Sequence, residues 1–169
     1  MIDKKIVARH ETAHMIVALA LGYPATGWLC ENIETEIIGG IPGIAVGKME
    51  WDEHDAATDA EQIMVAFAPL VYDFSFTNDS EENISERSGW DEQDIHEILA
   101  KYRKQSQRKK LREKCILRVY CILRDNREKL EEIADELMSG QKISHTPNFI
   151  CGSSTKNVNS VQDQAYCAA

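Results

Sequence analysis

Several features that would place the chain in a common class of protein are missing from its 169 residues. The longest apolar run, residues 15–21, is far too short to cross a bilayer, so we expect no membrane helix. The N-terminus shows no basic start, apolar stretch and cleavage site, so no secretory leader is expected either. A phosphate loop of the pattern G-x-x-x-x-G-K-[ST] is also absent, which argues against ATP hydrolysis by this chain.

Cysteine pairs and a basic charge are missing too. The five cysteines, at positions 30, 115, 121, 151 and 167, form an odd set without a C-x-x-C pair. Such a set fits the reducing cytoplasm better than a disulfide framework. A formal net charge of −9 argues against a general nucleic-acid binder. With 43% hydrophobic residues, the chain is long enough for one domain, which we expect over residues 1–150. Residues 151–169 are polar and predict a disordered tail.

Hydrophobic spacing predicts a mainly α, α+β fold with a small sheet of two or three strands. Alternation near residues 33–37 and the apolar run 44–49 suggest the strands, and residues 74–89 suggest a mobile loop. Pro69 is unfavourable inside the second predicted helix, because proline has no backbone N–H to donate. The basic stretch 101–118 is interpreted as the solvated face of the fourth helix, because an apolar stripe runs along its other side. Helices are expected over residues 6–21, 55–72, 101–125 and 128–138. A further helix, the third in chain order, is expected to begin at residue 90 or 91.

His10, Glu11 and His14 form the pattern H-E-x-x-H inside the first predicted helix. Residues four apart on a helix share a face, so both imidazoles can reach one metal ion. Zn²⁺ accepts neutral imidazole and leaves a position for water in a catalytic site. Glu11 lies next to the first ligand and is available as the general base for that water. The sequence therefore predicts a catalytic zinc site in which Glu11 acts on the water.

The third protein ligand is not decided by local spacing. The extended metzincin pattern is absent, because Val17 stands where its Gly would be and no third His follows. Glu34 lies at the distance used by thermolysin-like enzymes, but in a predicted strand. Glu61 could act from the second helix, and Asp91 and Asp94 both begin the third helix.

The order of these motifs resembles the peptidase domain of the FtsH-type ATP-dependent zinc metalloproteases, the M41 family. Residues 8–22 are similar to the family's A-x-H-E-A-G-H-A-x-V-A helix, and residues 41–47 to its I-P-R-G-x-A-L-G strand entry. Residues 88–95 resemble its T-G-A-x-N-D-L segment, and residues 126–137 its closing N-R-x-x-L-x-x-L-A-x-x-L helix. The matches follow the family order from residue 8 to about residue 143.

The resemblance implies a zincin-type helical fold in which His10, His14 and Asp94 bind zinc and Glu11 is the base. It implies Asp73 as an acidic residue behind the ligands. It also implies that an edge strand pairs with the extended substrate backbone. This chain departs from the family at Ala13, where the motif has Gly, and at residues 67–73, which lack the Gly-Gly and Arg of G-G-R-A-A-E-E. The edge strand that would pair with the substrate comprises residues Ala45, Val46, Gly47, Lys48 and Met49.

The function expected from the sequence is that of a cytoplasmic zinc endopeptidase. Without an ATPase module it would cleave unfolded or flexible protein segments, as a homo-oligomer or with a separate unfoldase. Neither nucleic acid nor membrane is an expected partner. Two alternatives stay open at this point. One is a catalytically silent relative that binds peptides or a partner, and the other is a regulatory H-E-x-x-H protein that cleaves repressors and uses Glu61.

Overall fold

The computed structural model describes residues 4–29, 47–52, 56–81, 84 and 89–150. Within these ranges the chain forms five α-helices and one three-stranded antiparallel sheet, so the predicted helical α+β class is confirmed. The strand expected near 33–37, the start of the run 44–49 and the tail 151–169 lie outside the described residues. The elements are α1 (Lys4–Ala20), β1 (Ala25–Leu29), β2 (Gly47–Trp51), α2 (Asp59–Phe76), α4 (Gly89–Ala100), α5 (Gln105–Asp125), α6 (Arg127–Met138), β3 (Ile143–His145) and the short 3₁₀ helix η2 (Pro147–Phe149).

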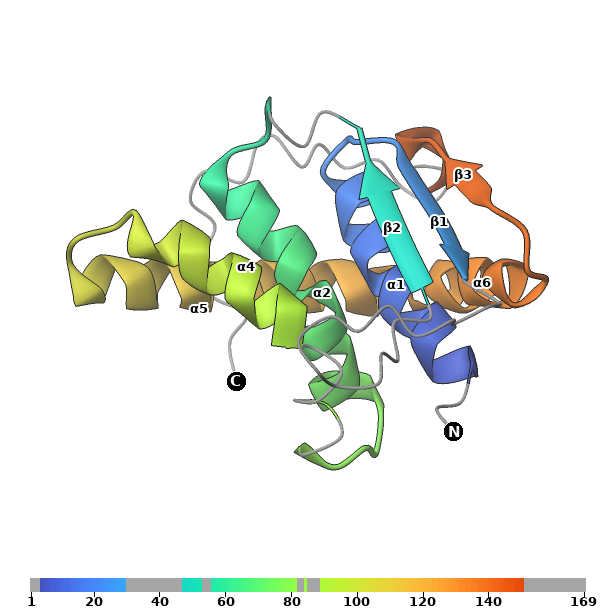
Figure 1. Ribbon diagram of the computed structural model, residues 1–169, viewed down its shortest axis with the longest axis horizontal. Coiled ribbons are helices and arrows are strands. Elements are labelled where there is room, and N and C mark those ends of the chain that lie inside the picture. The colour runs from blue at the N-terminus through green and yellow to red at the C-terminus, as the bar shows by residue number, and fades with distance from the viewer. Residues whose placement is uncertain (1–3, 30–46, 53–55, 82–83, 85–88, 151–169) are drawn as a thin grey trace, which may run out of the picture.

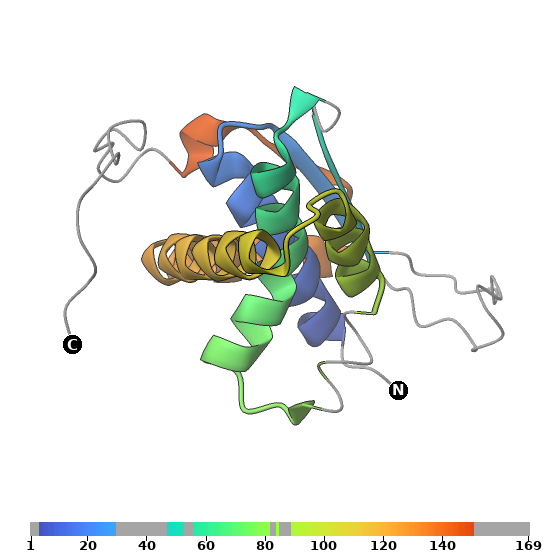
Figure 2. The same cartoon turned by 90° about the vertical axis from the view of Figure 1, so that its left-hand side faces the viewer.

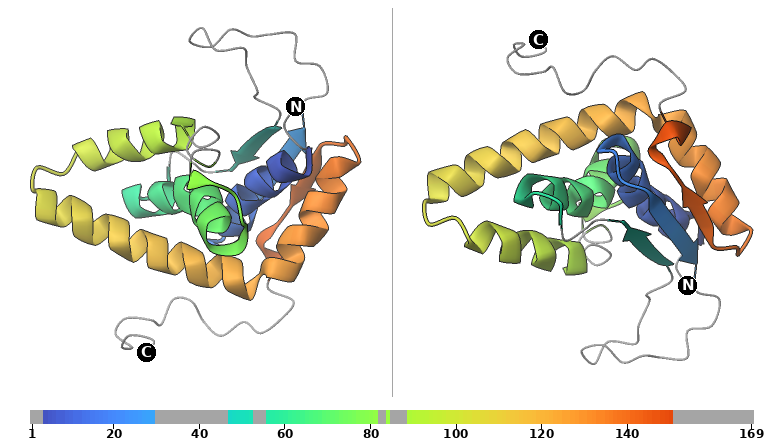
Figure 3. Two further views of the ribbon diagram at one scale, coloured as in Figure 1. Left: turned by 90° about the horizontal axis from the view of Figure 1, so that it is seen from below. Right: turned by 90° about the horizontal axis from the view of Figure 1, so that it is seen from above.

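The elements stack in three layers. α1 and α2 form the middle layer, α5 lies behind them, and α4 and the sheet lie in front (Figures 1 and 3). α4 and α5 are the arms of a hairpin, and α2 packs against both arms (Figure 3). The same layers appear from the side in Figure 2. α1 is therefore covered on several sides, and its residues 12–19 are all buried.

α1 ends where the sequence predicts, at a glycine. Gly22 has φ +98°, a backbone conformation that side chains rarely adopt. The N–H of Tyr23 donates to the carbonyl of Ala18, and that of Gly22 to the carbonyl of Leu19. These two bonds make a Schellman motif, which satisfies the last carbonyls of the helix. The chain then turns directly into β1.

The sheet has the strand order β2-β1-β3, with both neighbours antiparallel to β1. Alternate residues of β1 are buried, so one face of the sheet packs on α1. Gly27 makes this approach close, because a Cβ built on it would lie 2.6 Å from the Sδ of Met15. β3 was not predicted, and its short length explains why a periodicity of two could not reveal it.

α2 begins with a capping box, in which Thr58 and Glu61 satisfy each other's backbone N–H groups. The helix continues through Pro69 and ends at Phe76, four residues beyond the predicted end. A proline in a helix interior costs about 3 kcal/mol relative to alanine, yet this one is buried in the core. The loop predicted over 74–89 is wrong at its start, which is helical, and Ile84 is buried.

The basic residues of the fourth predicted helix face solvent, as expected. Nine Lys and Arg side chains between residues 101 and 118 are exposed. The buried positions of α5 are Cys115, Val119 and Leu123, which repeat every four residues. In the described part of the chain, no helix combines the length and apolarity that a membrane crossing requires.

Candidate metal centre

Three side chains from two elements converge at the front of α1. His10 and His14 come from α1, and Asp91 comes from the first turn of α4. The Nε2 atom of His10 lies 3.2 Å from one carboxylate oxygen of Asp91, and the Nε2 atom of His14 lies 3.3 Å from the other. Their donor atoms all lie within 4.8 Å of one another. Among the residues that the structure describes, this is the group whose side chains could hold a metal ion.

The helix itself places the two imidazoles. Their positions four residues apart bring the rings onto one face, with centroids 5.2 Å apart and planes at 77°. The side chains of His10 and His14 are 12% and 10% exposed, so the site is shielded but open to solvent on one side. The predicted pairing of these histidines on one face of α1 is confirmed.

His14 is fixed by a hydrogen bond to α2. Its Nδ1 atom lies 2.8 Å from the backbone oxygen of Val65. A carbonyl oxygen can only accept, so Nδ1 carries the proton of this bond. Nε2, which faces the Asp91 carboxylate, is then the nitrogen left to bind a metal ion. A ligand histidine commonly donates its second N–H in this way, which fixes both its tautomer and its ring orientation.

His10 lacks such a support in the described residues. Its Nδ1 atom is buried and has no hydrogen-bond partner there. A buried imidazole nitrogen without a partner is unusual, because the loss of water is not compensated. The two histidines are therefore held unequally, His14 by a backbone carbonyl and His10 through Nε2 and its contact with Asp91.

Asp91 reaches the site because it lies on the buried face of α4. Ile95 and Leu99, four and eight residues later, are both buried in the core. The other end of this segment is tied to α2, where Asp59 accepts hydrogen bonds from the Lys101 ammonium at 2.7 Å and the Tyr102 hydroxyl at 3.0 Å. The face of α4 that packs inward therefore delivers the carboxylate.

Asp94, the ligand expected from the family resemblance, lies outside this group of donors. Its side chain is exposed, while Asp91 faces both histidines. The two residues differ by three positions, which rotates them by about 60° and separates them by nearly one turn. Of the two neighbouring acids, Asp91 therefore belongs to the candidate donor group and Asp94 does not.

Burial and charge oppose each other at the site. Burial lowers the pKa of His14, but the charge and hydrogen bond of the Asp91 carboxylate more than offset this and raise it to about 9. Burial likewise works against ionisation of Asp91, yet the adjacent histidines hold the pKa of its carboxyl well below the usual range. Burial raises the pKa of Glu11, although the neighbouring histidine charges partly counter it. A metal ion must displace a proton from His14, so binding weakens as pH falls.

The remaining predicted site residues lie elsewhere. Glu61 is engaged in the capping box of α2, where its carboxylate accepts from Thr58, and it is not part of the donor group. Gly47, Lys48 and Met49 belong to β2, whereas Ala45, Val46 and Glu34 lie outside the described residues.

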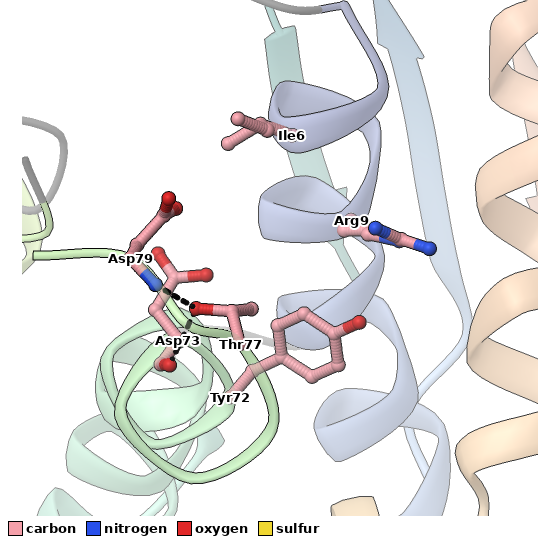
Figure 4. Close-up of a pocket in the computed structure, with 6 residues that line it drawn as sticks. All are labelled: Ile6, Arg9, Tyr72, Asp73, Thr77 and Asp79. Atoms are coloured by element: carbon pink, nitrogen blue, oxygen red, sulfur yellow. Dashed lines mark hydrogen bonds between the residues drawn. The ribbon is translucent and has the colours of Figure 1, made fainter.

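Asp73 is buried, but in a separate hollow of about 270 Å³ at the N-terminal end of α1. Figure 4 shows its carboxylate on the same side of this hollow as that of Asp79, across from α1. The hollow is lined by Ile6, Arg9, Tyr72, Asp73, Thr77 and Asp79.

The donor set fits zinc. Two imidazoles and one carboxylate with a further position for water make up a common catalytic zinc site. The two histidine nitrogens lie 3.2 and 3.3 Å from different oxygens of the Asp91 carboxylate, so the three side chains are close enough together to share one ion. Comparisons with protein-family models and with curated proteins find no match for the chain, so the assignment depends on this geometry.

Proposed function

We propose that this protein is a zinc metallopeptidase of the zincin type, which hydrolyses peptide bonds in unfolded or flexible protein segments. One observation carries the proposal. His10, His14 and Asp91 bring three metal donors together, and Glu11 lies between the two histidines in sequence, beside the same site. The order of motifs that resembles the FtsH-type peptidase domain agrees with this function. Because the cysteine set is odd, we propose the cytoplasm as its compartment.

Each residue has a distinct part in the proposed reaction. When bound, zinc supplies a Lewis acid for the scissile carbonyl and lowers the pKa of its water. Glu11 is half-buried, and its raised pKa brings the carboxyl closer to the pH at which it must exchange protons. It accepts the proton of the attacking water and then delivers it to the leaving amine. Asp91 stays ionised throughout, and its charge holds both imidazoles in place.

The edge of the sheet offers a route for the substrate. β2 is one of the two outer strands in the order β2-β1-β3, and it lies with the first turn of α4 in the front layer of the molecule (Figure 3). An extended peptide paired with an edge strand gains main-chain hydrogen bonds that do not depend on its sequence. Gly47, Lys48 and Met49 are the described residues that would bind the substrate backbone. Such binding suits a peptidase for unstructured segments.

Replacement of Glu11 tests the reaction. Glu11→Gln keeps the shape of the side chain but removes the base, so cleavage of unfolded casein and of fluorogenic peptides should fall by at least about 100-fold. The zinc content, measured by elemental analysis, should stay at one ion per chain. Glu92→Gln, an exposed change on α4, is the matched control and should cleave like the wild type.

The outcomes separate the competing functions. A wild type that binds zinc and unfolded peptides but cleaves none of them would be a silent binding protein. Loss of zinc in Glu11→Gln would make Glu11 a ligand and would contradict the role proposed for it.

A further inference from the structure

Pro69 leaves one carbonyl of α2 without its helical partner. In an α-helix the N–H of each residue bonds to the carbonyl four residues earlier, and proline has no N–H. The carbonyl that loses its bond to residue 69 is that of Val65. Both residues lie in the interior of α2 and both are buried, so water is not at hand to replace the missing donor. A buried carbonyl without a partner would be costly.

The donor that replaces it is His14. The Nδ1 atom of this histidine lies 2.8 Å from the oxygen of Val65, across the interface between α1 and α2. We propose that Pro69 is a positioning residue of the metal site. By withholding its own N–H, it reserves the carbonyl of Val65 for the His14 imidazole, whose Nε2 lone pair is then directed at the metal. Pro69 itself touches neither metal nor substrate in this account.

The positions of the prolines relative to the helices support the positioning role of Pro69 without reference to its burial. Among the prolines, Pro24 follows the end of α1 and Pro147 begins η2, both places where a missing N–H costs little. Pro69 is inside a helix, where it is unfavourable for the fold. The carbonyl that it releases is the one that accepts from a candidate ligand. Any proline at this position would free the Val65 carbonyl, and the specific observation is that the freed acceptor lies 2.8 Å from Nδ1 of His14.

Pro69→Ala tests the inference, which rests on His14 being a metal ligand as proposed above. Alanine restores the N–H, which then competes with His14 for the Val65 carbonyl. Because that oxygen keeps a second lone pair, we expect zinc affinity to weaken about tenfold, the lower end of the effect of losing a hydrogen bond behind a ligand. The melting temperature of the metal-free protein should be equal or higher, because alanine favours the helix. Pro147→Ala is the matched control and should leave zinc affinity unchanged.

Opposite changes in affinity and stability distinguish positioning from packing. If Pro69→Ala binds zinc within twofold of the wild type, or if affinity and melting temperature fall together, the inference is wrong. A second measurement needs no variant. In zinc-loaded, ¹⁵N-labelled wild type, nuclear magnetic resonance should show His14 with a proton on Nδ1 that exchanges slowly and none on Nε2. A proton on Nε2 of His14 would overturn the proposal even if Pro69→Ala fails to fold.

Zinc affinity and histidine protonation do not depend on turnover. A protein that binds zinc with the expected protonation but cleaves no peptide would disprove the peptidase and leave the role of Pro69 intact. Conversely, a working peptidase whose Pro69→Ala variant binds zinc normally would disprove only the inference about Pro69.

Discussion

The two halves of α1 differ sharply in burial. All residues from Thr12 to Leu19 are buried, whereas between Lys4 and Glu11 only Val7 and Ala8 are. The first half carries an ion pair between Arg9 and Glu131 at 2.7 Å and borders both the candidate metal site and the hollow of Figure 4. In the second half, His14 is hydrogen-bonded to Val65 of α2, and Met15 lies against Gly27 of β1.

The H-E-x-x-H motif spans the boundary between these halves. His10 and Glu11 belong to the open half, and His14 belongs to the buried half, where a carbonyl of α2 can hold it. One helix thus connects a buried core segment to the proposed reaction site. The comparison implies that substitutions in the second half should affect stability, and those in the first half should affect chemistry.

Truncation of matched isoleucines in the two halves should give the largest effect. Ile16 is fully buried and Ile6 is half-buried. Ile16→Ala should lower the free energy of unfolding by about 2–5 kcal/mol, because it leaves a cavity in a packed core. Ile6→Ala should cost less than about 2 kcal/mol, since its surroundings already include open space. Denaturant unfolding of the metal-free proteins measures both, and equal losses would contradict the division of α1.

The two acids of α4 give the next test, on the chemical side of the comparison. Asp91→Ala should weaken zinc binding by more than about 100-fold, since loss of a ligand exceeds the 10–100-fold effect of losing a supporting hydrogen bond. Asp94→Ala, on the exposed face of the same helix, should bind zinc within twofold of the wild type. Competition with a chromophoric chelator measures both constants. The reverse ranking would restore Asp94 as the ligand.

Replacement of Tyr72 should give the smallest of these effects, a change in how the free energy of unfolding depends on pH above about pH 9. Its hydroxyl donates to Glu131 at 3.0 Å, and burial together with the Glu131 charge raises the pKa of Tyr72 to about 12. The unfolded chain loses this proton near pH 10, so the stabilisation is complete below pH 10 and disappears as pH rises toward 12. Between pH 9 and 11 the wild type should lose about 1 kcal/mol more stability than Tyr72→Phe, followed by chemical denaturation. Parallel pH profiles would show that this contact contributes nothing.

Prediction from sequence worked wherever the determinants are local. The shared face of the two histidines and the end of the first helix just before Gly22 are both set within a few residues, and each is found as expected. Helical phase could also have favoured Asp91 over Asp94, since Asp91, Ile95 and Leu99 repeat at intervals of four.

Features that depend on contacts between distant parts of the chain could not be predicted from the sequence. β3 has three residues and pairs with β1, which precedes it by more than one hundred positions. Nothing near His14 in the sequence indicates that the carbonyl of Val65 will accept its proton. Pro69 was recognisable as unfavourable in a helix, but its consequence appears only once α1 and α2 are packed together.

The placement of Asp91 on α4 would give a bound metal ion a structural role in addition to the proposed catalytic one. Two donors lie on α1 and the third lies more than seventy positions later, at the start of the hairpin that α4 and α5 form. An ion held by all three would tether this hairpin to the centre of the molecule and close a long loop of chain. Removal of the ion by a chelator should therefore do more than stop the proposed peptide hydrolysis. It should release α4 from α1, so that amide hydrogens of α4 exchange faster while those of the buried half of α1 remain protected.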